Sequence, residues 1–468
     1  MFDRRSFLSA AWAAAVAGAG ASNQRLLGGE APTVTNPRAT DGDQVHEPDW
    51  EQQLTISVGP DKADLVGRDD KVIQAAVDYV SRLGGGTVQL QPGTFTLRNA
   101  VFLPSRLRLR GSGADTVITK IASETIALAD DSDWYDQEIT LADPGGFRVG
   151  DGVVLRATNP HDGSSTVIKR TLIARSGNRF KLNDGLRKNL WLSGKPTCAS
   201  LFPLLTSEYT SDVVIEDLTL DGHRSQNENL DGNYAGCIFL QDCNRYTIRC
   251  IEARNYNGDG ISFQICHDVV VEQCYSHDHA GLGLHPGSGS QRPRLIGNRL
   301  ERNEIGLFWC WGVKYGLAER NRIDANRSCG ISIGHNDTDN VMRDNEIINS
   351  GRVGVLFRDE ARGKDFWANR NVLERNRIVD SGQREGIAID VQGRTKDLTI
   401  VGNELRETRD PASRIGIRIA AAAERIELTD NRIEGFSQTV RDERPGNVGN
   451  HQPMKLRGDQ EMTVGMPS

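Results

Sequence analysis

The hydrophobic and polar positions of this chain form short alternating runs that recur along most of its length. From Val213 onward, a Gly repeatedly precedes a run whose first and third residues are apolar and whose second and fourth residues vary. Successive side chains of a strand point to opposite faces, so the apolar positions are expected to point inward and the variable ones to face solvent. The pattern predicts short stacked strands. The marking glycines are Gly260, Gly281, Gly306, Gly330, Gly354, Gly386 and Gly416.

A second repeat consists of Asn, any residue, and then Leu or Ile, at intervals of 23, 24, 31, 27 and 28 residues. A nearly fixed period with small insertions is typical of a solenoid, whose coils each pack only on their neighbours. Propeller blades need about 40 residues each, and sandwich strands pair through hairpin turns. We therefore expect a parallel solenoid with the Asn side chains stacked in a hydrogen-bonded ladder. The repeated residues are Asn298, Asn321, Asn345, Asn376, Asn403 and Asn431.

The N-terminal part of the repeat region carries a recognisable order of elements. An amphipathic helix over residues 69–78 is followed by Gly84-Gly-Gly-Thr-Val-Gln-Leu-Gln-Pro-Gly-Thr-Phe95 and by Leu109-Arg-Gly-Ser-Gly113. This strongly resembles the N-terminal cap and first coils of the pectate-lyase superfamily. The resemblance implies an all-β fold, a single-stranded right-handed parallel β-helix with an N-terminal capping helix. That superfamily includes lyases, hydrolases, epimerases and binding proteins, so the resemblance implies the fold and leaves the activity open.

The chain divides into four expected segments. Residues 1–21 combine Arg4-Arg5-Ser-Phe-Leu8 with an Ala-rich apolar run, which resembles a bacterial twin-arginine export signal. Residues 22–59 are a leader, residues 60–436 the β-helix, and residues 437–468 a polar C-terminal tail. A stretch at about 127–200 interrupts the repeat and is expected to be a small β-rich insertion. The export signal predicts a periplasmic or secreted protein.

Composition excludes some classes of function. The chain has 468 residues, a net charge of −7 and 37% hydrophobic residues. No basic footprint for nucleic acid is present, and the N-terminal apolar run is too short for a comfortable membrane span. The expected partner is a polysaccharide, and the oligomeric state stays open. Eight cysteines include Cys243 and Cys266, which are separated by one repeat and are therefore either stacked thiols or a disulfide.

When the coils are aligned on the marked Gly, the fourth residue after it forms one outward column. Its members are Gln264, His285, Cys310, Gly334, Arg358 and Asp390. We expect an active-site groove beside this column. Candidate catalytic residues are His285, His335, Asp337, Arg358, Asp359 and Glu360, and candidate substrate-binding residues are Trp311, Lys314, Asp259 and Asp390. Trp309 is expected in the core.

These residue types fit cleavage of a glycosidic bond in a polysaccharide, with a uronate-containing chain as one candidate. Hydrolysis needs an acid and a base or nucleophile, usually two carboxylates, which Asp337, Asp359 and Glu360 supply. β-Elimination needs a cation that neutralises a uronate and a base for its C5 proton, for which Arg358 and the histidines are candidates. The alternatives are a uronate epimerase and a non-catalytic carbohydrate-binding envelope protein. No spacing demands a metal or a cofactor, although acidic residues leave Ca²⁺ binding open.

Overall fold

The computed structural model describes residues 31–35, 47–382, 386–409 and 413–446. The expected export signal therefore lies outside the described residues, as do much of the leader and most of the tail. In the described part of the chain, no helix is long and apolar enough to cross a membrane.

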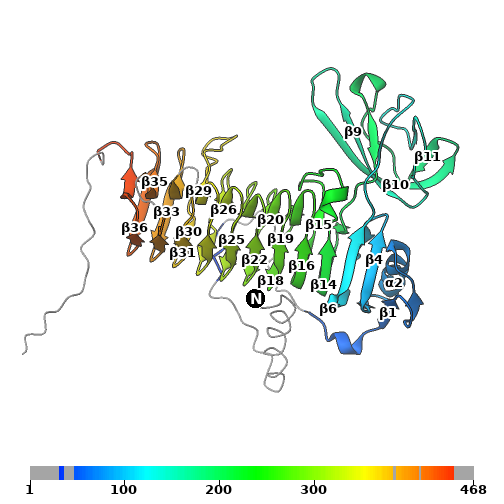
Figure 1. The fold of residues 1–468 in the computed structure, drawn as a ribbon, viewed down its shortest axis with the longest axis horizontal. Coiled ribbons are helices and arrows are strands. Elements are labelled where there is room, and N and C mark those ends of the chain that lie inside the picture. Colours follow the sequence, from blue (N-terminus) through cyan, green and yellow to red (C-terminus); the bar gives the residue numbers. More distant parts are fainter. Residues whose placement is uncertain (1–30, 36–46, 383–385, 410–412, 447–468) are drawn as a thin grey trace, which may run out of the picture. The chain divides into compact units, whose positions relative to one another are not determined.

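The chain winds into stacked coils whose strands pair in parallel with the equivalent strands of the next coil (Figure 1). One set of strands, which we call sheet B, follows the Gly-marked runs. Its members, in spatial order, are β5 (Val101–Phe102), β13 (Leu205–Glu208), β15 (Gly236–Gln241), β17 (Asp259–Gln264), β20 (Leu282–Gly287), β23 (Ile305–Phe308), β26 (Cys329–Ile333), β29 (Val353–Phe357), β32 (Ile387–Val391), β35 (Ile415–Ile419) and β38 (Gln438–Asp442).

The remaining coil strands form sheet A. They are β1 (Thr55–Gly59), β2 (Leu65–Val66), β3 (Gly86–Leu90), β4 (Gly93–Leu97), β6 (Leu107–Lys120), β14 (Ser211–Asp221), β16 (Asn244–Arg254), β18 (Val270–Glu272), β19 (Tyr275–His277), β21 (Arg294–Ile296), β22 (Arg299–Glu301), β24 (Leu317–Glu319), β25 (Arg322–Asp324), β27 (Val341–Arg343), β28 (Glu346–Ile348), β30 (Val372–Glu374), β31 (Arg377–Val379), β33 (Lys396–Val401), β34 (Glu404–Arg406), β36 (Glu424–Thr429) and β37 (Arg432–Glu434).

A continuous apolar column fills the inside of the coils. In sheet B, the residue after each marking Gly or its equivalent points inward and is fully buried, as in Ile261, Leu284, Leu307 and Ile331. Trp309 is also fully buried, as predicted. Each coil alone could not bury these side chains, so the stacking of the coils creates the core.

The predicted Asn ladder is confirmed. Each ladder residue donates from Nδ2 to Oδ1 of its equivalent in the next coil, over 3.0 Å from Asn298 to Asn321 and 2.8 Å from Asn321 to Asn345. The pattern continues through Asn376 and Asn403 to Asn431. The residue before each ladder Asn has a left-handed backbone, for example Asp344 with a φ of 53°. That sharp corner separates two sheet A strands and turns the Asn side chain into the core.

Helix α2 (Asp70–Arg82) covers the first coil, next to β1 and β3 (Figure 1). Asp69 caps its N-terminus by accepting a hydrogen bond from the backbone N–H of Val72 over 3.2 Å. Ile73, Val77 and Val80 are fully buried on its inner face. The helix thus shields the open end of the apolar column, as the capping prediction requires. Short 3-10 helices occur at η1 (Trp50–Gln52), η2 (Leu192–Gly194) and η3 (Arg224–Gln226).

The insertion forms a separate sheet with its own core (Figure 1). Its strands are β7 (Thr125–Ala127), β8 (Glu138–Thr140), β9 (Gly152–Thr158), β10 (Ser165–Ser176), β11 (Arg179–Leu182) and β12 (Thr197–Ala199), and they pair antiparallel. It is joined to the coils by Arg98 Nε with Asp151 Oδ1, 2.7 Å apart, and by Lys169 Nζ, which donates to the carbonyl of Tyr234 over 3.0 Å. The insertion therefore reaches the loop that precedes β15.

Candidate functional site

The outward side chains of sheet B define one row across neighbouring strands, which we call the outer row. The strand registers align Thr206 with Phe239, Phe239 with Ser262 and Ser262 with His285. Further along, they align Ser332 with Leu356 and Leu356 with Asp390. Phe308 joins the two parts, because it pairs with Ser332 and its ring centroid lies 5.3 Å from that of His285.

This register corrects the sequence alignment of the coils. Ser262 pairs with His285, so the glycine equivalent to Gly260 is Gly283 and not Gly281. Similarly, Leu356 pairs with Asp390, so Ala388 takes the place of the Gly386 mark. His285 and Asp390 therefore belong to the outer row and not to the column of Gln264 and Cys310. The error arose because two glycines, Gly281 and Gly283, precede apolar residues at β20, and because the equivalent position at β32 is Ala388 and not a glycine.

His285 and Asp259 form a buried pair at the centre of the outer row. His285 Nδ1 lies 2.8 Å from Asp259 Oδ2, and the two residues are only 4% and 3% exposed. A carboxylate can only accept, so Nδ1 carries the proton, and Nε2 is left as the ring atom able to accept one. The backbone N–H of Leu282 fixes Asp259 by donating to Oδ1 over 2.9 Å. The pair thus holds one imidazole in a defined tautomer.

Arg358 follows β29, two strands beyond the β23 strand of Phe308, and makes contacts with several elements. Its guanidinium carbon lies 4.3 Å from the Phe308 ring centroid, and its Nη1 donates to Ser332 Oγ over 2.8 Å. Nη2 donates to the carbonyl of Trp309 over 3.0 Å, and Nε donates to Glu360 Oε2 over 3.1 Å. The side chain is held rigidly, with a positive charge close to His285 across one aromatic ring.

Lys169 supplies a second cation on the other side of His285, and sequence reasoning missed it. It comes from β10 of the insertion, and its ammonium lies 4.0 Å from the ring centroid of Phe239, two strands from His285 in the outer row. Burial lowers the pKa of Lys169 to about 8. No local motif marks this lysine, because its position depends on a contact between the insertion and the coils.

The other predicted residues separate into distinct environments. Asp337 is fully buried and accepts from the backbone N–H groups of Val313 and Gly334 over 2.9 and 3.0 Å, so its carboxylate shapes a turn. Burial raises its pKa to about 6 against the opposing effect of Arg358, whose Nη2 is 3.8 Å away. Asp359 accepts from the indole of Trp367 over 2.9 Å.

Asp390 lies farther along the outer row. Its carboxylate accepts from Gln392 over 2.6 Å and from Arg418 over 3.2 Å. Lys314 forms parallel bridges with Gln291 and Thr338 in the turn after β23.

Trp311 and His335 meet in an aromatic cluster beside Arg358. The two ring centroids are 4.3 Å apart, and the Phe366 ring lies 6.1 Å from that of His335. The Arg362 guanidinium lies 4.7 Å from the Trp311 ring centroid. Burial, assisted by Arg362, lowers the pKa of His335. Trp311 is 45% exposed, so part of its ring surface is available for contact with a ligand.

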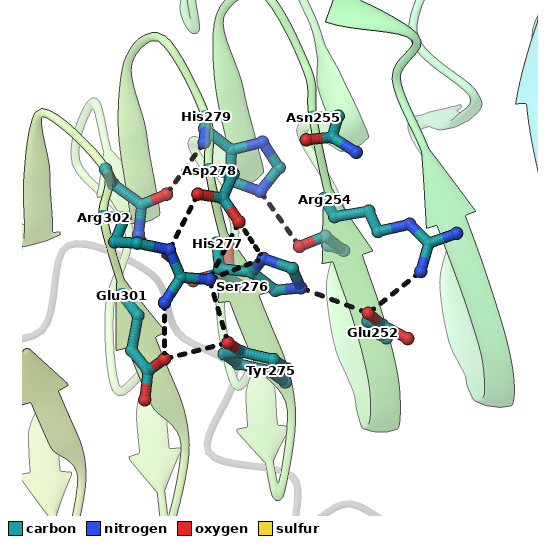
Figure 2. A network of polar contacts seen from close by, with 12 residues as sticks. Glu252, Arg254, Asn255, Tyr275, Ser276, His277, Asp278, His279, Glu301 and Arg302 are labelled. Carbon is teal, nitrogen blue, oxygen red and sulfur yellow. Dashed lines mark hydrogen bonds and ion pairs between the residues drawn. The ribbon is translucent and has the colours of Figure 1, made fainter. Parts of the chain in front are cut away.

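A second polar network lies on sheet A, across β16, β19 and β22 (Figure 2). His277 lies between two carboxylates, with Nδ1 2.6 Å from Asp278 Oδ2 and Nε2 3.2 Å from Glu252 Oε1. Each ring nitrogen of His277 thus faces a carboxylate oxygen, so the ring links β16 to the turn after β19. The ring of Tyr275 stacks on His277 at 3.9 Å, and Arg302 donates to both oxygens of Asp278 over 2.8 Å.

This network connects neighbouring coils. The hydrogen bond from Arg302 holds the pKa of Asp278 well below its usual range. Both ring nitrogens of His279 contact backbone atoms, the N–H of Tyr256 at 3.0 Å and the carbonyl of Ala253 at 3.1 Å. Burial lowers the pKa of His279 to about 3, so the ring is neutral. The histidines of this segment therefore serve packing and pairing between coils.

Comparisons with known proteins agree with the fold. Residues 218–366 match the family model described as right handed beta helix region, and residues 311–453 match the model described as periplasmic copper-binding protein (NosD). A search of curated protein sequences finds no match.

Among solved structures, the A-module of the Azotobacter vinelandii mannuronan C-5 epimerase AlgE4 is 18% identical, with a TM-score of 0.50 over 83% of this chain and 98% of that chain. An alginate lyase from Paenibacillus is 12% identical, with a TM-score of 0.41 over 83% of this chain and 97% of the other. The protein is a right-handed parallel β-helix, and these solved structures are similar to it in fold.

The copper named in one family description was tested against the residues present. In the described part of the chain, no group of three His, Cys, Asp or Glu side chains could hold a metal ion. Within the matched region, the soft donors Cys329 and Met342 are both buried among core residues. These residues do not fit a resident copper centre.

Proposed function

We propose that this protein acts on a uronate-containing polysaccharide along the outer row of sheet B and removes the C5 proton of a bound uronate. The observation that carries the proposal is the Asp259–His285 pair at the outer row, with one cation on either side: Lys169 lies against the Phe239 ring and Arg358 against the Phe308 ring. A periplasmic or extracellular location is compatible with the NosD match and fits a polysaccharide substrate.

The roles follow from the chemistry of each side chain. His285, held by Asp259 with its proton on Nδ1, accepts the C5 proton at Nε2. Lys169 and Arg358 flank it and offset the negative charge that grows on the uronate carboxylate as the proton leaves. Trp311 offers an exposed aromatic face for a neighbouring sugar ring. Loss of the C4–O4 bond from the resulting carbanion, with a solvent proton taken up by O4, gives β-elimination. Reprotonation of C5 by solvent at the opposite face gives epimerisation.

Proton abstraction is favoured over hydrolysis because each candidate carboxylate already has a hydrogen-bond or ion-pair partner within the protein. Asp337 binds backbone N–H groups, Asp359 binds an indole, and Glu360 binds Arg358. Hydrolysis would require two carboxyl groups that face one another across a bound glycosidic bond. The paired state of the same side chains also supports the second candidate, a non-catalytic binding protein, because a fully paired surface can hold a glycan without reacting.

The test is a panel of polyuronates and neutral polysaccharides incubated with purified protein, with and without Ca²⁺. Ultraviolet absorbance from a C4–C5 double bond together with new reducing ends identifies a lyase. A change in uronate configuration without new ends identifies an epimerase. New reducing ends without absorbance identify a hydrolase and contradict the proposal. Binding without any product identifies the non-catalytic alternative.

A further inference from the structure

A group of exposed aromatic rings lies on the insertion, separate from the outer row. Trp134 and Tyr135 are 55% and 64% exposed, and their ring centroids are 5.9 Å apart in an edge-to-face arrangement. The ring of Trp191 lies 5.4 Å from that of His161, also edge to face. We call Trp134, Tyr135, Trp191 and His161 the aromatic platform.

One carboxylate connects the two halves of the platform. Asp133 accepts from the indole N–H of Trp191 over 3.2 Å at Oδ1 and from the hydroxyl of Tyr135 over 3.0 Å at Oδ2. The rings are therefore neighbours in space although about 55 residues separate them in the sequence.

The backbone beneath the rings is fixed. Ser132 and Leu190 exchange two backbone hydrogen bonds, of 3.2 and 2.8 Å, across an antiparallel bridge. The N–H of Trp134 donates to Asn189 Oδ1 over 2.9 Å. Both segments rest on the insertion's own core, to which Leu190 belongs. A rigid platform loses little conformational entropy when it binds a ligand.

Large exposed rings are uncommon on a soluble surface unless they serve contact. Sugars have apolar C–H faces that stack on aromatic rings and hydroxyl edges that donate to carboxylates.

The charge beside the rings distinguishes between ligand classes. Asp130, Asp131, Asp133 and Asp136 lie within four residues of Trp134. Two cations lie on the facing segment: Arg187, which is engaged with Asp184 at 3.3 Å, and the exposed Lys188. The four carboxylates outnumber them. Such a surface repels a polyanion and suits an uncharged donor of hydrogen bonds.

From this geometry we propose that the insertion binds a neutral polysaccharide, with its pyranose rings stacked on Trp134 and Tyr135. The platform differs in charge from the outer row, which Lys169 and Arg358 flank, so the two surfaces would prefer different saccharides. The proposal does not depend on the chemistry assigned to His285, because it concerns binding alone.

The experiment measures binding of the intact protein to soluble neutral β-glucan and xylan, and to polyuronate at the same ionic strength, by affinity electrophoresis and calorimetry. Trp134→Ala and Tyr135→Ala are each expected to weaken binding to the neutral glycan about 3- to 10-fold. Tyr79→Ala, which removes an exposed aromatic ring from α2, is the matched control and is expected to leave this binding unchanged.

Three results would overturn the proposal. The first is no binding to either neutral glycan by the folded wild-type protein. The second is a loss of polyuronate binding, and not of neutral binding, in the Trp134 variant. The third is sedimentation of the wild type as a dimer that Trp134→Ala dissociates, which would assign the platform to a second copy of the chain. Folding of each variant is checked by circular dichroism, and Trp134→Phe, which keeps an aromatic face, is expected to restore most of the binding.

Discussion

Asn345 offers a direct test of how the ladder stabilises the coils. Its Oδ1 accepts from the backbone N–H and from Nδ2 of Asn321 over 3.0 and 2.8 Å, and its Nδ2 donates to the carbonyl of Ala318 over 3.0 Å. Substitution by Ala leaves these three buried groups without their partners. The fourth contact, to Asn376 Oδ1, is partly preserved, because that oxygen also accepts from the backbone N–H of residue 345 over 3.0 Å.

The expected cost follows from that inventory. A buried group that loses its hydrogen bond costs about 1–3 kcal/mol, and neighbouring losses are not additive, so Asn345→Ala should lower the free energy of unfolding by about 3–6 kcal/mol. The matched control is Glu346→Ala in the adjacent position, which removes surface ion pairs with Arg322 and Arg377 and should cost about 1 kcal/mol or less.

Urea unfolding followed by circular dichroism and by tryptophan fluorescence measures both variants. The two probes should give the same midpoint if the coils unfold together. A loss for Asn345→Ala no larger than that for Glu346→Ala would refute the reasoning, because it would mean that the ladder bonds contribute no more than surface ion pairs.

Three further predictions use the other buried charges. Burial lowers the pKa of Lys120 to about 7, so above that pH the unfolded chain binds more protons than the folded chain. The free energy of unfolding should therefore rise between pH 7 and about 10. Lys120→Met should remove this rise in thermal melts. The pKa of Asp278 is lowered by Arg302, so its contribution to stability is present above the ordinary carboxyl pKa and is lost only at lower pH. Arg302→Met should therefore move the acid-unfolding midpoint to higher pH, and an unchanged midpoint would show that the network in Figure 2 does not stabilise the coils. Lys169, with a pKa of about 8, loses its charge above that pH, so the KM for a polyuronate should rise above pH 8 in the wild type and stay flatter in Lys169→Arg.

The sequence was sufficient for the fold because the fold is periodic. Every coil needs inward apolar residues after the marked Gly and an Asn for the ladder. Both signals therefore recur along the sequence. The capping helix could also be predicted, because Asp69 and the apolar face of α2 are local sequence signals.

Only part of the candidate site could be predicted from the sequence. The sequence placed His285, Arg358 and Trp311 on the outward face of the coils, but it misaligned His285 by two residues because Gly281 and Gly283 both mark the strand. Lys169 could not be predicted, because it reaches the outer row from another sheet. The Tyr275–His277 network was missed since alternating charged residues on an outward face look like solvated surface.

The central claim is that His285 removes a uronate C5 proton, and the most direct measurement is exchange of that proton with solvent. Polyuronate incubated with wild-type protein in deuterium oxide is followed by nuclear magnetic resonance, which detects deuterium at C5 in an epimerised residue and loss of the C5 proton in an unsaturated end. The account predicts exchange or elimination by the wild type, a loss of about 100-fold or more in His285→Gln, and a loss of about tenfold or more in Asp259→Asn. Asp324→Asn, in β25 of sheet A, serves as the control that keeps wild-type activity. Turnover of the polymer that proceeds equally well in His285→Gln, or new reducing ends from a chain whose C5 protons stay in place, would contradict the account.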